Sequence, residues 1–183
     1  MAQPEEETAD TVSPSIYIFH MRECDPKKCT ALKLGRLGLA KVSYSINRLP
    51  TSSILLYPFA KEVLSPQDRQ IALSRGISAI DCSWNKIEEL LQLRRFNARQ
   101  LPFMLAGNPI NYSIPFKLST LEALSSALYI TGFTREARFL LSKVKWGETF
   151  LTLNREPLDL YSSARDLEEV KRLSDEYQKV YNI

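Results

Sequence analysis

The chain has 183 residues, of which 44% are hydrophobic and 25% are charged, and its formal net charge at pH 7 is +3. These values are typical of a globular protein with one domain or two small ones, and they exclude a collagen-like or wholly disordered chain. No uncharged apolar run approaches the roughly 20 residues that a membrane-spanning helix needs, so we expect no membrane partner.

The N-terminal segment 1–14 is predicted to be a disordered acidic tail. It contains four of the 21 acidic side chains and none of the 24 basic ones, so the remaining chain carries a net charge of +7. That charge suits a polyanion such as RNA, although many moderately basic proteins bind no nucleic acid. An acidic N-terminus does not have the pattern of a secretory signal, and the three cysteines, an odd number, then indicate a reducing cytoplasm.

An α/β domain is predicted for residues 15–105. Short apolar runs rich in β-branched and aromatic residues indicate strands, and the stretch from Ser65 to Gly76 has the N-cap, early proline and terminal glycine of a helix. The predicted strands are 15–20, 40–46, 54–58, 77–81 and 99–105, and the predicted helices are 30–35, 65–76 and 83–93. Strands and helices that alternate at this spacing are typical of a parallel sheet with right-handed crossovers.

An all-α domain is predicted for residues 106–183. It begins with an aperiodic loop, 106–118, whose length is uncommon in a compact domain unless the loop has a role such as contacting a ligand. Ser119 and Glu122 have the spacing of a capping box at the start of the first helix. Further helices are predicted at 135–145, from 157 onward and at 166–181, the last with a clear amphipathic period.

Metal and nucleotide signatures are missing from the sequence. His20 is the only histidine, and its place at the end of a strand-like run favours a structural role. Cys24 and Cys29 lie five positions apart with no second pair, so we expect no zinc site and no other metal. Neither G-x-G-x-x-G nor G-x-x-x-x-G-K-[ST] occurs, which argues against a Rossmann or Walker site.

The carboxyl ends of the strands are where an open parallel sheet binds its ligands. Trp84 follows a predicted strand there, where it offers a flat face to a ring system or plugs the junction between the two halves. Asp81 accepts a proton, binds a ribose hydroxyl or caps the next helix. Basic residues flank the same edge, either as contacts for RNA phosphates or as a solvated rim: Arg22, Lys27, Lys28, Lys33, Arg36, Arg94, Arg95 and Arg99.

Six motifs in order resemble a known family. They are Cys24-Asp-Pro-Lys-Lys-Cys-Thr30, Asp81-Cys-Ser-Trp84, Leu101-Pro102, Ala106-Gly-Asn-Pro-Ile-Asn-Tyr112, Lys117-Leu-Ser-Thr-Leu-Glu-Ala123, and Trp146-Gly147 with Asn154. The set resembles the ribosomal-RNA aminocarboxypropyltransferases that complete a hypermodified uridine of small-subunit rRNA, in their short archaeal form. The resemblance covers nearly all of the chain from Ile16 to Tyr161.

The resemblance implies a SPOUT-like parallel sheet with a trefoil knot in the N-terminal half, and an all-α C-terminal half that closes over a cleft. It implies S-adenosylmethionine (SAM) as co-substrate and transfer of the 3-amino-3-carboxypropyl (acp) group to N3 of an N1-methylpseudouridine, releasing methylthioadenosine. A monomer acting on rRNA of the small subunit in the cytoplasm is expected. The alternatives are a SPOUT RNA methyltransferase and a non-catalytic RNA-binding assembly factor.

The resemblance also assigns individual residues. Thr30 would hold the methionine carboxylate of SAM, and Asp81, with Glu122 as second candidate, would accept the N3 proton. Phe116 stands where relatives often carry Tyr or Trp, and Ser113 replaces a glycine. The complete set for SAM is Thr30, Leu56, Pro58, Ile80, Trp84, Leu101, Phe116, Leu118 and Thr120, and the expected rRNA face is Arg22, Lys28, Arg36, Arg94, Arg95 and Arg99.

Overall fold

The structure is a computed structural model that describes residues 12–82 and 95–183. Most of the predicted acidic tail and the predicted helix at 83–93 therefore lie outside the described residues, as do Trp84 and Arg94.

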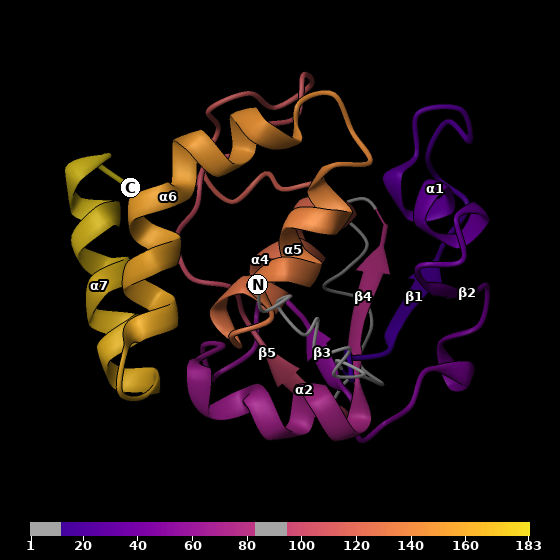
Figure 1. The fold of residues 1–183 in the computed structure, drawn as a ribbon, viewed down its shortest axis with the longest axis horizontal. Coiled ribbons are helices and arrows are strands. Elements are labelled where there is room, and N and C mark those ends of the chain that lie inside the picture. The colour runs from indigo at the N-terminus through magenta and orange to yellow at the C-terminus, as the bar shows by residue number, and fades with distance from the viewer. Residues whose placement is uncertain (1–11, 83–94) are drawn as a thin grey trace, which may run out of the picture.

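A five-stranded sheet forms the centre of the N-terminal half (Figure 1). Its strands are β1 (Ile16–His20), β2 (Lys41–Ser43), β3 (Ile54–Leu56), β4 (Ile77–Asp81) and β5 (Asn97–Arg99). Their order is β2-β1-β4-β3-β5 and every pair is parallel, which confirms the predicted parallel sheet. The register places His20 directly beside Asp81, so the ends of β1 and β4 coincide.

Strand β5 ends at Arg99, so it shares only this residue with the predicted strand at 99–105. Pro102 has no amide hydrogen to donate to a neighbouring strand. The next backbone groups are bound by helical side chains instead, because Phe103 N donates to Ser174 Oγ (2.9 Å) and Leu105 N to Asn154 Oδ1 (2.8 Å). The prediction of a strand through residue 105 is therefore wrong, and the segment is held by side chains of the C-terminal half.

Alternate residues of β1, β3 and β4 face two apolar clusters, as the two-residue period of a strand requires. Ile18 and Ile54 belong to the larger cluster, which continues into the helices, whereas Phe19 and Leu55 belong to a smaller cluster that includes Leu49. The larger cluster contains side chains from both predicted halves, so the sheet and the helices share one core.

The helices of the N-terminal half are short. Helix α1 spans Thr30–Arg36, and α2 (Arg69–Arg75) follows a 3₁₀ turn at Pro66–Asp68 that starts at a capping box of Ser65 and Asp68. A second 3₁₀ turn covers Ile46–Arg48.

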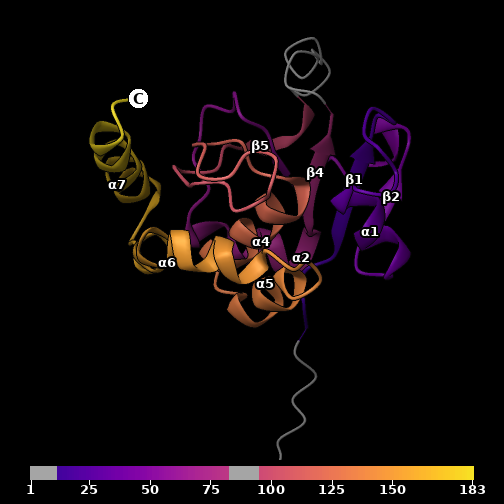
Figure 2. The ribbon, with the colours of Figure 1, turned by 90° about the horizontal axis from the view of Figure 1, so that it is seen from above.

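The C-terminal half contains α4 (Thr120–Ile130), α5 (Thr134–Leu141), α6 (Gly147–Ser163) and α7 (Leu167–Val180). Both views show α4 next to the sheet and α7 at the end of the molecule away from β2 (Figures 1 and 2). The prediction that a helix starts at Pro157 is wrong, since α6 starts at Gly147 and includes Pro157. No helix among the described residues is long and apolar enough to cross a membrane.

Candidate active site

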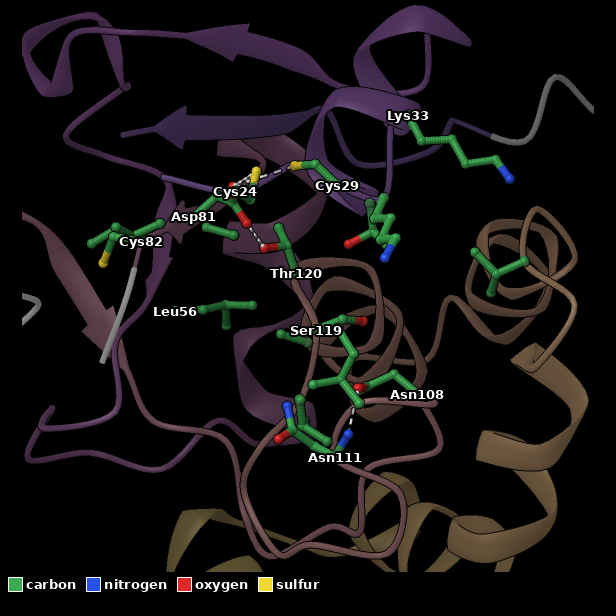
Figure 3. Close-up of a pocket in the computed structure, with 18 of the residues that line it drawn as sticks. Cys24, Cys29, Lys33, Leu56, Asp81, Cys82, Asn108, Asn111, Ser119 and Thr120 are labelled. Carbon is green, nitrogen blue, oxygen red and sulfur yellow. Dashed lines mark hydrogen bonds between the residues drawn. The ribbon is translucent and has the colours of Figure 1, made fainter. Parts of the chain in front are cut away.

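A cavity of about 1340 Å³ lies beyond the carboxyl ends of β3, β4 and β5. Its walls come from the N-terminal half, from the loop 106–118, from the start of α4 and from the turn between α5 and α6. Figure 3 shows this arrangement, with Cys24, Cys29 and Asp81 on one side and Asn108 and Asn111 on the other. The position matches the place where ligands of open parallel sheets bind.

The residues that the resemblance assigns to SAM gather in this cavity. All eight of them within the described residues line it, although they are spread along the chain from position 30 to position 120. They are Thr30, Leu56, Pro58, Ile80, Leu101, Phe116, Leu118 and Thr120. The ninth, Trp84, lies outside the described residues.

Two threonines connect helix α4 to the N-terminal half. Thr120 Oγ1 donates a hydrogen bond of 2.6 Å to Asp81 Oδ1, so the first turn of α4 is attached to the end of β4. Thr30 Oγ1 accepts a hydrogen bond of 3.4 Å from Leu121 N, which joins the starts of α1 and α4. Both hydroxyl groups belong to residues that line the cavity.

Glu122 has a structural role instead of the predicted catalytic one. Its side chain is fully buried, and it is not among the residues that line the cavity. Oε1 accepts hydrogen bonds from Gly107 N (2.7 Å) and Asn108 N (3.0 Å), and Oε2 accepts from Asn108 Nδ2 (2.8 Å) and Ser119 N (2.6 Å). The carboxylate thus holds the loop 106–118 against α4, and the structure does not support Glu122 as a proton acceptor.

The loop 106–118 contributes Asn108, Asn111 and Phe116 to the cavity wall. The resemblance assigned Phe116 to SAM, whereas for Asn108 and Asn111 the sequence indicated only that the loop contacts a ligand. Ser113 has a φ of 61°, in the left-handed region that favours glycine, and its amide donates to Ala106 O at 2.7 Å. This conformation suits the glycine that the resemblance places at this position.

Asp81 is the only carboxylate among the described residues that line the cavity. Its Oδ2 lies 3.3 Å from His20 Nε2 and 3.5 Å from the Sγ atoms of Cys24 and Cys29. Burial raises the pKa of both thiols, and the charge of Asp81 raises them further.

Five basic side chains line the cavity. Lys28 and Arg36, both predicted as RNA contacts, line it together with Lys27, Lys33 and Lys145. Arg22 and Arg95 do not line it. Arg22 lies over the ring of Tyr44 at 4.3 Å, and Arg95 donates to Asn47 Oδ1 at 2.7 Å.

The predicted RNA contact at Arg99 does not fit the structure. Its guanidinium pairs with Asp68 at 3.1 Å and Glu62 at 3.0 Å, and only 14% of the side chain is exposed. A positive charge that is already paired with two carboxylates attracts a phosphate weakly, so we assign Arg99 to the stability of the fold.

Several residues that line the cavity were not predicted from the sequence. Trp146 and Lys145 come from the turn before α6, far from the sheet in sequence. The signal for them was the Trp146-Gly147 motif, because a side chain at Gly147 would collide with the backbone oxygen of Leu141. Only glycine permits this close turn, which brings Trp146 to the cavity.

The chain is similar to known proteins along most of its length. Residues 54–178 match the family described as "Ribosome biogenesis protein, C-terminal", and residues 14–43 match "Possible Fer4-like domain in RNase L inhibitor, RLI". Curated relatives named 16S rRNA aminocarboxypropyltransferase include one from Methanosarcina acetivorans (46% identical; 88% of this chain and 93% of the relative covered). Another comes from Methanopyrus kandleri (46% identical; 87% and 96% covered). The solved structure of the SAM-dependent rRNA:acp-transferase Tsr3 from Vulcanisaeta distributa aligns with a TM-score of 0.79 at 39% identity, covering 91% of this chain and 97% of that one.

Proposed function

This chain belongs to the 16S rRNA aminocarboxypropyltransferase family, and we propose that it transfers the acp group of SAM to N3 of an N1-methylpseudouridine in small-subunit rRNA. The products are the modified rRNA and methylthioadenosine. The observation that carries this proposal is the gathering of eight residues, assigned to SAM from their motifs, in one cavity at the ends of the strands.

The cavity suits a nucleoside with a charged tail. Leu56 and Leu101 provide apolar surface for the adenosine part, and the backbone carbonyl of Ile80 is assigned to its ribose. Thr30 and Lys33 provide polar groups for the methionine part. Binding sites for small molecules typically enclose about 300–1,000 Å³. The larger volume here, about 1340 Å³, leaves room for a target base beside SAM.

The choice of the transferred group depends on positioning. SAM, a sulfonium, supplies three carbons that a nucleophile can attack, and the carbon that faces the acceptor determines the product. In this proposal Thr30 holds the methionine carboxylate and Trp84 covers the methyl group, so that the acp carbon faces the base. The role of proton acceptor for Asp81 stays a prediction.

The basic rim serves the RNA substrate. Lys27, Lys28, Arg36 and Lys145 surround the cavity that would receive the target base. Their charges would hold the phosphates on either side of the modified nucleotide and so fix its register without reading the sequence. For Arg22 and Arg95, which lie away from the cavity, the RNA contact stays a prediction.

Three finer features complete the proposal. The first is a SPOUT-like trefoil knot in the N-terminal half. The second is a division into a SAM-binding half, residues 15–105, and a helical half, residues 106–183. The third is that the protein is a cytoplasmic monomer without a membrane partner. The all-parallel sheet and a cavity lined from both halves support the first two. A chain trace in an experimental structure tests the knot, and light scattering of the purified protein tests the monomer.

An assay with two SAM labels tests the activity. Small-subunit rRNA from a strain that lacks the modification is incubated with the protein and SAM labelled on the methyl or on the carboxyl carbon. Only the carboxyl label is expected in the RNA, with the methyl label recovered in methylthioadenosine. Methyl label in the RNA would instead identify a methyltransferase, and RNA binding without either label would identify a non-catalytic assembly factor.

A further inference from the structure

Four potential metal ligands converge at the ends of β1 and β4. His20 ends β1, Asp81 ends β4, Cys24 lies in the loop between β1 and α1, and Cys29 directly precedes α1. One ligand atom from each residue lies within 4.8 Å of all the others. His20 and Cys29 are buried, with 3% and 6% of their surface exposed, and Figure 3 shows both cysteines next to Asp81.

The distances between these atoms match the edges of a tetrahedron around one ion. His20 Nε2 lies 3.1 Å from Cys24 Sγ and 3.4 Å from Cys29 Sγ, and both sulfurs lie 3.5 Å from Asp81 Oδ2. The distance from Nε2 to Oδ2 is 3.3 Å. With zinc–sulfur bonds of about 2.3 Å and zinc–nitrogen or zinc–oxygen bonds of about 2.0–2.1 Å, tetrahedral edges are about 3.3–3.8 Å long, and the longest joins the two sulfurs.

We propose that His20 Nε2, Cys24 Sγ, Cys29 Sγ and Asp81 Oδ2 bind one Zn²⁺ ion. Two thiolates, an imidazole and a carboxylate in tetrahedral arrangement are a ligand set that zinc prefers, whereas Mg²⁺ and Ca²⁺ prefer oxygen ligands only. An iron–sulfur cluster does not fit, because its irons and sulfides would hold the four protein ligands farther apart. The proposal replaces the expectation, drawn from the cysteine spacing, that the chain binds no metal.

Zinc binding requires a change in the hydrogen bonding of the His20 ring. Its Nδ1 accepts a hydrogen bond of 3.0 Å from Arg22 N, which places the proton of the neutral ring on Nε2. Zinc binding through Nε2 moves this proton to Nδ1, so the Arg22 amide has to turn away. One backbone hydrogen bond is thereby exchanged for a zinc–nitrogen bond, and the Arg22 amide becomes a reporter of metal binding.

The ion would fix a segment that has little regular structure. Residues 21–29 form only turns between β1 and α1, and Thr30 follows them directly. Asp81 also accepts the hydrogen bond of Thr120 through its other oxygen, Oδ1. A zinc ion here would therefore connect the loop, the sheet and the start of α4 behind the cavity. With zinc on Oδ2 and Thr120 on Oδ1, Asp81 would have a positioning role and would not accept the N3 proton.

Metal content of the full-length protein tests the proposal without reference to its activity. The purified protein is incubated with ZnCl₂, freed of unbound ion and analysed by mass spectrometry of its metals. About one zinc per chain is expected for the wild type and for the matched control Cys82→Ala, and about a tenth or less for Cys24→Ala and Cys29→Ala. Zinc should raise the thermal midpoint of the wild type, and it should shift the Arg22 amide resonance.

Cobalt keeps the test independent of how well the variants fold. Wild-type protein loaded with CoCl₂ should show the thiolate-to-cobalt charge-transfer absorption and the visible bands of tetrahedral Co²⁺, both of which Zn²⁺ should abolish. A wild type that retains no zinc, a Cys82→Ala variant that loses zinc as completely as Cys24→Ala, or bound iron with inorganic sulfide would each overturn the proposal.

Discussion

Replacing Glu122 by Gln tests whether its carboxylate stabilises the fold or takes part in the reaction. The substitution removes the negative charge and turns one of the two oxygens into an amide nitrogen. Because Oε1 accepts from two backbone amides and Oε2 accepts from Asn108 Nδ2 and Ser119 N, the new NH₂ group faces donors whichever way it points. We therefore expect Glu122→Gln to destabilise the loop 106–118.

The size of the effect follows from the hydrogen bonds that are lost. Two of the four bonds to Glu122 disappear, and a hydrogen bond to a charged group contributes about 1.5–3 kcal/mol, so the free energy of unfolding should fall by about 3–6 kcal/mol. Since 1 kcal/mol shifts the melting temperature of a protein of this size by about 2–4 °C, the expected loss is about 6–24 °C.

Thermal unfolding followed by circular dichroism measures this shift. Glu148→Gln is the matched control, because Glu148 is exposed in the first turn of α6, and it should change the melting temperature by about 2 °C or less. Activity is then measured well below the melting temperature of each variant. A Glu122→Gln protein that melts like the wild type and yet transfers no acp group would refute this reasoning, because the carboxylate would then act in the reaction.

Five other substitutions test the site and the fold. Thr30→Val removes the hydroxyl group assigned to the SAM carboxylate, and calorimetry should show SAM binding weakened by about 10- to 100-fold. Log K for RNA binding falls as log[salt] rises, and Lys28→Gln and Arg36→Gln should each make that slope less negative by about 0.7–0.9. Arg99→Gln should leave the slope unchanged and lower the melting temperature, because the charge of Arg99 is paired within the fold. Burial raises the pKa of Tyr161, so the native state keeps a proton that the unfolded state loses above about pH 10. Stability should therefore fall as the pH rises beyond 10, and Tyr161→Phe should remove part of that fall in pH-dependent denaturation.

Local patterns predicted much of the architecture. The strands at 15–20 and 77–81, the capping box of Ser119 and Glu122, and the amphipathic helix at 166–181 all occur within a few residues of their predicted bounds. These features depend on neighbours within one or two turns, which a sequence displays directly. The boundaries failed where distant side chains compete with the local pattern, as at residues 103–105, whose amides bond to α6 and α7.

The capping box also shows what a local pattern leaves open. The spacing of Ser119 and Glu122 predicted that Glu122 caps a helix, but it left a catalytic role possible. The answer came from Gly107 and Asn108, whose amides point at the same carboxylate from a loop fifteen and fourteen residues away. Arg99 is a second example. Its positive charge predicted a phosphate contact, but in the structure the charge is paired with Glu62 and Asp68.

The sequence by itself predicted the parallel α/β character from its periodicity. Its motifs indicated the family and eight of the residues that line the cavity. Only the tertiary structure decided which of these residues meet. His20 and Asp81 are 61 positions apart, and they become neighbours because β4 lies between β1 and β3 in a register that pairs their last residues. Strand order and register depend on packing across the whole sheet, which no local pattern encodes. For that reason the cysteine spacing argued against a metal, while the folded chain brings together four ligands for one.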